Sequence, residues 1–117
     1  DLKTAYEAIK ISSGNSFVHE TESQVILNGS YNISFTMDLV LKDMGLFNDL
    51  SIKNDIPLEL SPLVLDIFKD GQKKYGPKAW SSMIVKRLED ACKTNLRAEG
   101  FPAELKDTEP EEKGHEI

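Results

Sequence analysis

Few side chains in this sequence have types and spacing suited to chemistry, and metal binding is the first possibility they raise. His19 and His115 are far apart, and neither has a second ligand at the spacing that a zinc site requires. We therefore predict no metal site and expect His19, which neighbours Glu22 and Ser23, to be an exposed or half-buried polar residue. Cys92, the single cysteine, is expected to be a small buried side chain rather than a nucleophile.

The most concentrated group of basic residues consists of Lys73, Lys74 and Lys78. These lysines lie where the periodicity predicts the end of a helix, and positive charge there complements the helix dipole without any phosphate ligand. A Gly-rich loop between a strand and a helix, which would indicate a nucleotide-binding domain, does not occur in the sequence. From these residues alone, the chain is a helical domain of undetermined function.

Charge is unevenly distributed along the chain. The net charge is −6 over 117 residues, and residues 104–117 hold six acidic residues against two lysines. A nearly neutral body with an acidic end lacks the basic field that nucleic acid or an anionic membrane surface requires, so neither is expected as a partner. No stretch is apolar for long enough to span a bilayer, and residues 1–20 lack a signal-peptide core. Together with the lone cysteine, these features favour a cytoplasmic protein.

The positioning elements are predicted to be helices. Apolar residues recur at helical spacing, and no segment of useful length has the alternation of a strand. The sequence therefore predicts an all-α fold, a compact bundle of about five helices. The expected helices cover residues 2–11, 17–27, 35–53, 61 to Gly71 or Gly76, and 80–91.

The ends of these helices carry further predictions. The first helix has an apolar stripe but no residue suited to cap its start, so it is expected to be a truncated helix, the end of a longer one. Gly14 is expected to terminate it with a positive φ, and the Asn28-Gly29-Ser30 turn is expected to terminate the second helix. The third helix is apolar around much of its circumference, which predicts that most of it is buried.

Apolar periodicity ends after Lys93. The Phe101-Pro102 pair is expected to dock locally, and the acidic stretch after it is expected to be mobile. We therefore divide the chain into a helical domain, residues 1–95, and an acidic C-terminal extension, residues 96–117.

Several short motifs, in their order and spacing, resemble those of a known family. They are Ser12-Ser13-Gly14-Asn15-Ser16, Leu27-Asn28-Gly29, a run with the pattern F-x-x-x-L-x-x-K-D that begins at Phe35, and Ile56-Pro57-Leu58. Together they resemble the second, all-helical domain of the 3-hydroxyisobutyrate dehydrogenases, part of the wider β-hydroxyacid dehydrogenase group. The resemblance covers about residues 1–93.

The resemblance implies a reaction and a division of labour between two domains. In that family an N-terminal Rossmann domain holds NAD or NADP, a long helix links it to the helical domain, and the active site lies in the cleft between them. The family's catalytic lysine lies in a G-x-x-G-x-x-x-K-x-x-N-N motif that is absent here, so no catalytic residue is assigned and that lysine is expected upstream of Asp1. The resemblance thus implies half of an oxidoreductase that interconverts a 3-hydroxy acid and its semialdehyde. This half is expected to be inactive alone, with the Rossmann domain, a small-molecule substrate and further subunits of a homo-oligomer as partners.

The same resemblance assigns cofactor-binding roles to Lys42 and Phe35. Lys42 matches the family's lysine near the nicotinamide end of the cofactor, and Phe35 matches an aromatic residue that lines the cleft. Residues seven apart on a helix differ by roughly 20° in direction, so the two would share a face of a helix that begins at residue 35. Asp38, one turn before Lys42, is expected to hold the lysine in place through an ion pair.

A second interpretation assigns no ligand to these residues. A single lysine on an apolar helix is usually a solvated surface residue, and a phenylalanine is usually part of the core. In that case the chain is a non-enzymatic helical interaction module. The apolar surface of the chain, which exceeds what a bundle of five helices can hide, fits the subunit interface that the resemblance implies.

Overall fold

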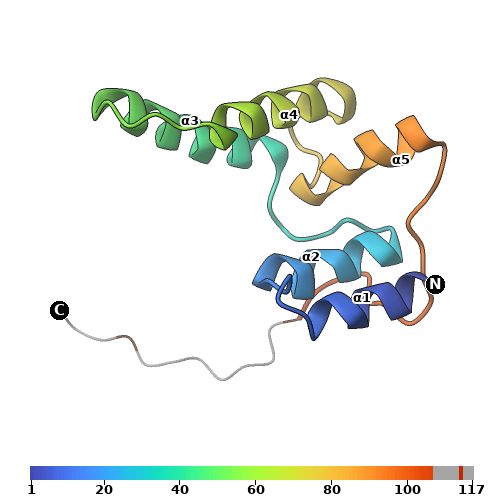
Figure 1. Cartoon of the computed structure of the whole chain (residues 1–117). Coiled ribbons are helices and arrows are strands. Elements are labelled where there is room, and N and C mark those ends of the chain that lie inside the picture. The colour runs from blue at the N-terminus through green and yellow to red at the C-terminus, as the bar shows by residue number, and fades with distance from the viewer. Residues whose placement is uncertain (107–113, 115–117) are drawn as a thin grey trace.

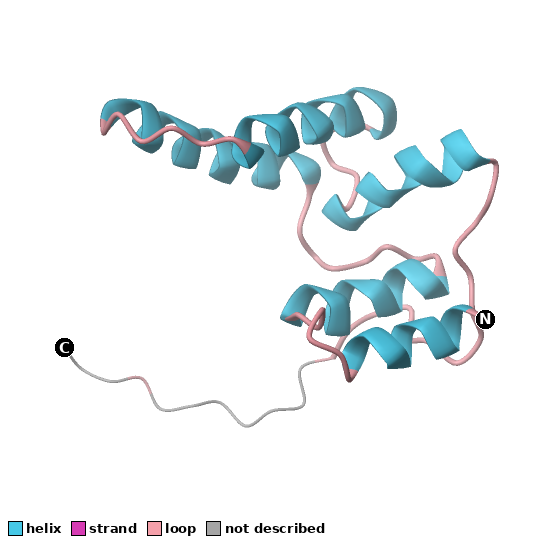
Figure 2. Ribbon diagram, in the orientation of Figure 1, coloured by secondary structure: helices cyan, strands magenta, loops and turns pink. Residues whose placement is uncertain are grey.

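The computed structural model describes residues 1–106 and residue 114, and within them helices are the regular secondary structure, joined by loops and without strands. The five α-helices and one 3₁₀ helix (Figures 1 and 2) are α1 Leu2–Lys10, α2 Phe17–Asn28, α3 Met37–Lys53, α4 Leu60–Tyr75, η1 Ser81–Val85 and α5 Lys86–Cys92. The predicted all-α fold is therefore confirmed. Most of the acidic end that was expected to be mobile, and His115, lie outside the described residues.

The helices form two hairpins joined by a short bridge. Helix α1 packs on α2, and α3 packs on α4, while η1 contacts α2, α4 and α5. In Figure 1 the α3–α4 hairpin lies above the α1–α2 hairpin, and the segment that follows α2 runs between them. The 3₁₀ helix is thus the element through which the two hairpins are connected by packing.

Of the predicted ends of the first two helices, the start and the end of α1 differ from the prediction, and the end of α2 agrees with it. Asp1 caps α1, because its carboxylate accepts hydrogen bonds from the Thr4 N–H at 2.9 Å and the Thr4 hydroxyl at 2.8 Å. The prediction of an uncapped start was therefore wrong, and it no longer argues for a truncated helix. Gly14 does not adopt a positive φ, because α1 already ends at Ile11, whose φ is −94°. Gly29, in contrast, ends α2 in the left-handed conformation with φ 91°, as expected.

The close approach of α3, α4 and η1 depends on Gly71. This glycine is buried inside α4, and a Cβ atom there would lie 2.6 Å from Ile84 Cδ1 and 3.2 Å from Met37 Sδ. Met37, the first residue of α3, is completely buried at this crossing. The end of α4 is set instead by Gly76, whose φ of 94° suits glycine.

Beyond its first residue, α3 is much less buried than its composition predicted. Met37 is its one fully buried residue, whereas several large apolar side chains further along the helix are exposed. They are Leu46, Phe47, Leu50 and Ile52. The prediction was wrong because α3 packs on one neighbour, α4, which covers a single side of it. Ile56, after α3, and Leu60 and Leu63 on the first turns of α4 are exposed as well, and we call these seven residues the α3–α4 apolar surface.

The last helical segment differs from the single helix expected over residues 80–91. Residues Ser81–Val85 form a 3₁₀ turn, and only Lys86–Cys92 form an α-helix. A 3₁₀ helix has 3.0 residues per turn instead of 3.6, so it rotates the residues that follow it relative to one continuous α-helix. As a result Leu88 is 66% exposed, whereas Glu89 is 2% exposed.

After α5 the chain returns to the first hairpin. The Ala98 N–H donates to the Leu27 carbonyl at 3.0 Å, and the Asn28 side-chain amide donates to the Phe101 carbonyl at 2.9 Å. The Phe101 ring meets Tyr6 edge-on, with 5.1 Å between ring centroids. The expected docking of Phe101 is thus confirmed. The division of the chain after residue 95 stays a prediction.

Candidate functional site

The candidate site is built around the start of α3, which is capped by a distant turn rather than by its own side chain. Thr36 precedes the helix but makes no side-chain cap hydrogen bond. Instead, the Met37 N–H donates to the Ala79 carbonyl at 2.9 Å and the Asp38 N–H donates to the Pro77 carbonyl at 3.0 Å. These carbonyls accept from N–H groups that have no partner within the helix. The turn after α4 therefore fixes where α3 begins.

Phe35 lies in the extended segment before α3 rather than on the helix. Its carbonyl accepts a hydrogen bond from the Ser81 N–H at 2.8 Å, and Thr36 forms an antiparallel bridge with Trp80. Because the helix begins at Met37, the argument that Phe35 and Lys42 share a helical face was wrong. The Phe35 side chain is half-buried. Its predicted role in lining a cofactor cleft stays a prediction.

Lys42 projects from the second turn of α3 into solvent. Its side chain is 61% exposed, and its Nζ atom lies 3.1 Å from Asp43 Oδ1, a carboxylate that is itself 56% exposed. An ion pair between two such exposed groups contributes little to stability, so Lys42 can readily exchange Asp43 for another anionic partner. The ammonium of Lys42 is therefore accessible to an anionic ligand.

Asp38 does not hold Lys42, contrary to the sequence-based prediction. Its Oδ2 atom pairs with Lys78 Nζ at 2.6 Å, and its Oδ1 atom accepts hydrogen bonds from the Thr36 hydroxyl and, at 3.0 Å, from the Leu39 N–H. The hydrogen bond from Lys78, and next the one from Thr36, hold the pKa of Asp38 below its ordinary value of 3.8. Asp38 is therefore ionised at neutral pH with both carboxylate oxygens engaged. The prediction failed because Lys78 is 40 positions away in the sequence.

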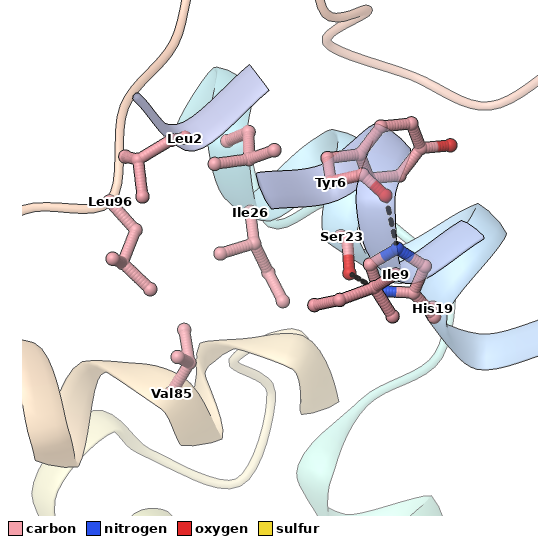
Figure 3. A pocket seen from close by; sticks show the side chains of 9 residues that line it. Leu2, Tyr6, Ile9, His19, Ser23, Ile26, Val85 and Leu96 are labelled. Carbon is pink, nitrogen blue, oxygen red and sulfur yellow. Dashed lines mark hydrogen bonds between the residues drawn. The ribbon is translucent and has the colours of Figure 1, made fainter. Parts of the chain in front are cut away.

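A separate cavity of about 230 Å³ opens between the α1–α2 hairpin, η1 and the segment after α5 (Figure 3). Its lining is mostly apolar and consists of Leu2, Tyr6, Ile9, His19, Ser23, Ile26, Leu27, Val85 and Leu96. Neither Phe35 nor Lys42 belongs to this lining. The cavity is therefore distinct from the predicted cofactor site.

His19 lies in this cavity with both ring nitrogens in hydrogen-bond contact (Figure 3). Its Nε2 atom is 3.0 Å from the Tyr6 carbonyl, and its Nδ1 atom is 3.3 Å from Ser23 Oγ. Since a carbonyl can only accept, Nε2 carries a proton and donates it to the Tyr6 carbonyl. The ring also stacks on Tyr6 at 4.9 Å. The expected half-buried, polar character of His19 is confirmed.

Cys92 is exposed, so the prediction of a buried side chain was wrong. It lies on the last turn of α5, and the chain turns away directly after it because Lys93 adopts a left-handed conformation with φ 52°.

Among residues 1–106 and 114, no three His, Cys, Asp or Glu side chains are grouped closely enough to hold a metal ion. In the same part of the chain, no helix is long and apolar enough to cross a membrane.

The sequence interpretation missed a buried charged cluster formed by Glu89, Tyr31 and Arg97. Glu89 accepts hydrogen bonds from the Tyr31 hydroxyl at 2.5 Å, from the Leu96 N–H at 2.7 Å and from Arg97 Nη1 at 3.0 Å. Arg97 Nη2 also donates to the Tyr31 hydroxyl at 2.5 Å. The cluster joins α5 and the segment directly after it to Tyr31, which is 58 positions before Glu89. No local pattern could have indicated it, because the 3₁₀ turn before α5 decides that Glu89 points inward.

The electrostatics of Glu89 show that its charged form is stabilised by its partners. Burial by itself raises the pKa of this carboxyl group. The hydrogen bonds from Tyr31 and the Leu96 N–H, together with the charge of Arg97, outweigh that effect and leave the pKa below its ordinary value of 4.5. A buried carboxylate with these partners fastens the fold together, and its position away from the start of α3 separates it from the candidate site.

Comparison with known proteins identifies relatives of this chain. The family model described as the NAD-binding domain of NADP-dependent 3-hydroxyisobutyrate dehydrogenase matches residues 1–104. The chain is 26% identical to L-threonate dehydrogenase of Haemophilus influenzae over 85 residues, which are 73% of this chain. Over the same length, or 72% of this chain, it is 32% identical to 2-(hydroxymethyl)glutarate dehydrogenase of Eubacterium barkeri. The chain spans 28% of the length of each of these relatives.

The all-α fold and these matches define the class as a helical domain of hydroxyacid dehydrogenases. The chain belongs to the 3-hydroxyisobutyrate dehydrogenase family, as the order of its motifs predicted. The matched region includes the whole of α3 with Lys42, and the turn that caps this helix.

Proposed function

We propose that this chain is the C-terminal domain of a cytoplasmic NAD(P)-dependent oxidoreductase that interconverts a 3-hydroxy acid, similar to 3-hydroxyisobutyrate, and its semialdehyde. The observation that carries the proposal is the accessible ammonium of Lys42 on the second turn of α3, inside the region that the family model matches. Its partner, Asp43, is an exposed carboxylate that a phosphate-bearing ligand can replace.

The residues present suit one end of a bound dinucleotide. An ammonium group attracts the anionic cofactor, and the half-buried ring of Phe35, a few residues before it, offers an apolar surface. When bound, NAD or NADP supplies the hydride transfer, and the protein positions and polarises the reactants. The proposed share of this chain is to bind and orient the cofactor through Lys42 and Phe35. The phosphate loop and the lysine that acts in acid/base catalysis belong to the proposed upstream Rossmann domain, so the chain alone is expected to be inactive.

The role of Lys42 is tested by Lys42→Ala in the complete protein. Loss of one charge-assisted contact typically weakens binding by about 1.5–3 kcal/mol, so we expect the KM for the dinucleotide to rise about tenfold or more. Lys53→Ala is the matched control, because Lys53 is an exposed lysine at the other end of the same helix. An unchanged KM in Lys42→Ala would remove this residue from the cofactor site.

Two further partners belong to the proposal. A Rossmann domain precedes this chain in the complete protein, and the complete protein forms homo-oligomers through the α3–α4 apolar surface. The side chains of Phe47 and Leu50 there are 54% and 58% exposed, and large contiguous apolar surfaces mark interaction sites. Analytical ultracentrifugation of Phe47→Lys should show a smaller species than the unchanged protein. The same mass for both would rule out this surface as the subunit contact.

The same apolar surface also supports a second candidate, a non-enzymatic helical interaction module in which Lys42 is only solvated. The two candidates differ in what precedes this chain in the complete protein. An upstream strand followed by G-x-G-x-x-G in one reading frame supports the enzyme, and its absence supports the module. Membership of a dehydrogenase family makes the enzyme our first choice.

A further inference from the structure

Asp38 and Lys42 are placed to pair with each other. They are four residues apart on α3 with the acid first, an arrangement that stabilises a helix by about 0.2–0.5 kcal/mol when the ion pair forms. In the described part of the chain, however, the ion pairs within 4.0 Å join Asp38 to Lys78 and Lys42 to Asp43. The favourable local pair is thus replaced by one between residues 40 positions apart.

The turn that carries Lys78 is fixed by its own backbone. The turn begins at Gly76, whose φ of 94° turns the chain, and the Pro77 and Ala79 carbonyls on either side of Lys78 accept from the first two N–H groups of α3. Lys78 is therefore attached at the start of α3 by two hydrogen bonds that do not involve its side chain. Its Nζ atom reaches Asp38 Oδ2 at 2.6 Å while the side chain stays 80% exposed.

Both oxygens of the Asp38 carboxylate are consequently engaged by groups other than Lys42. Lys78 occupies Oδ2, while the Thr36 hydroxyl and the Leu39 N–H occupy Oδ1. Without Lys78, the ionised Oδ2 atom would lose its cation, and the nearest lysine along the same helical face is Lys42. A carboxylate that pairs with Lys42 competes with any anionic ligand for its ammonium.

We propose that Lys78 is a positioning residue for Lys42: by holding Asp38, it prevents that carboxylate from pairing with Lys42, so that the dinucleotide has to displace the exposed Asp43 carboxylate but not Asp38 from the Lys42 ammonium. This inference rests on the proposed cofactor role of Lys42. It predicts that Asp38 inhibits binding only when Lys78 is absent. Lys78 then acts through Asp38 and makes no contact with the cofactor.

The test is a double-mutant cycle in the complete protein, with the dissociation constant of the dinucleotide measured by fluorescence quenching. Lys78→Ala should raise the dissociation constant about twofold, the fold-change that corresponds to one helical ion pair. Adding Asp38→Asn should return it to the original value, because the competing charge is gone. Lys78→Arg, which keeps the ion pair, should bind normally, as should the control Lys74→Ala, which breaks the exposed Lys74–Asp70 pair on α4.

A second measurement follows Lys42 directly and does not depend on cofactor. The rate at which an amine-reactive reagent modifies Lys42, read by mass spectrometry of its peptide, should fall in Lys78→Ala and recover in Lys78→Ala/Asp38→Asn. If this pattern appears while Lys42→Ala leaves binding unchanged, the pairing is correct and the proposed cofactor role of Lys42 is wrong. Equal reactivity in all variants overturns the inference. It is also overturned if the double variant binds the dinucleotide as weakly as Lys78→Ala, since Lys78 then contacts the cofactor itself.

Discussion

Two carboxylates in this molecule have the same kinds of partner and opposite surroundings. Asp38 accepts from a hydroxyl group, a backbone N–H and the ammonium of Lys78. Glu89 accepts from a hydroxyl group, a backbone N–H and the guanidinium of Arg97. The Asp38 side chain is 29% exposed and that of its cation Lys78 is 80% exposed, whereas the Glu89 side chain is 1% exposed and that of Arg97 is 37% exposed.

Because of this difference in burial, the cluster around Glu89 stabilises the fold, whereas the cluster around Asp38 can change its ion pairs. Removing a partner from a buried ion pair leaves a desolvated charge without compensation, which is strongly destabilising. At an exposed pair, water replaces the lost partner, and little stability is lost. Glu89 therefore serves to hold three segments together. The charges around Asp38 can be rearranged without unfolding the domain, which a ligand-binding site requires.

The largest loss of stability is expected from Glu89→Ala. It leaves the Tyr31 hydroxyl, the Leu96 N–H and Arg97 without their shared acceptor, so the free energy of unfolding should fall by about 3–5 kcal/mol. Urea denaturation followed by circular dichroism measures the change. Glu7→Ala, at an exposed position on α1, should be nearly neutral. A loss below about 1 kcal/mol in Glu89→Ala would show that the buried cluster matters no more than a surface pair.

Acidification should give the next largest effect. Because the folded state lowers the pKa of Glu89, its ionised form stabilises the fold fully at pH values above the ordinary value of 4.5. That stabilisation is lost as the pH falls below 4.5 and through the lower pKa of the folded state. Thermal unfolding at a series of pH values should show this decline, and Glu89→Gln should reduce its slope. An identical slope for the unchanged protein and Glu89→Gln would assign acid unfolding to other carboxylates, such as Asp70 beside Arg87.

The smallest effect is expected from Asp38→Asn. Although Lys78 and Thr36 lower the pKa of Asp38 as well, this ion pair is exposed, and asparagine keeps the acceptor for the Thr36 hydroxyl and the Leu39 N–H. Its thermal midpoint should therefore stay close to that of the unchanged protein. If Asp38→Asn destabilises the domain as much as Glu89→Ala, burial does not distinguish the two clusters, and the comparison fails.

Local signals predicted where the helices lie but not all of their ends. Gly29 marks the end of α2 because its φ of 91° favours glycine, whereas α4 begins at Leu60, one residue before the predicted start at residue 61. The order of the short motifs predicted the family, because this order is a property of the sequence and needs no knowledge of contacts in the fold. Asp1 directly precedes the apolar stripe of α1 and was overlooked as its cap, which led to the prediction of a truncated helix.

Contacts between segments that are distant in the sequence could not be predicted from the sequence. The partner of Asp38 is 40 positions away, and the Tyr31 hydroxyl reaches Glu89 across 58 positions. The inward direction of Glu89 depends on a 3₁₀ turn, whose hydrogen-bond pattern the apolar periodicity does not reveal. Lys42 was found through the family motif, and its accessibility became visible only with the ion pairs around it.

The return of the chain to its first helix has a consequence for how the domain folds. Phe101 packs against Tyr6, so residues nearly a hundred positions apart must meet before the packing between them is complete. Closing so long a loop reduces chain entropy before its contacts form, which slows folding and favours all-or-none unfolding over the separate melting of each hairpin. A domain that stops after α5 leaves the Tyr6 ring without its edge-on partner, so a domain that extends beyond Phe101 should be the more stable of the two.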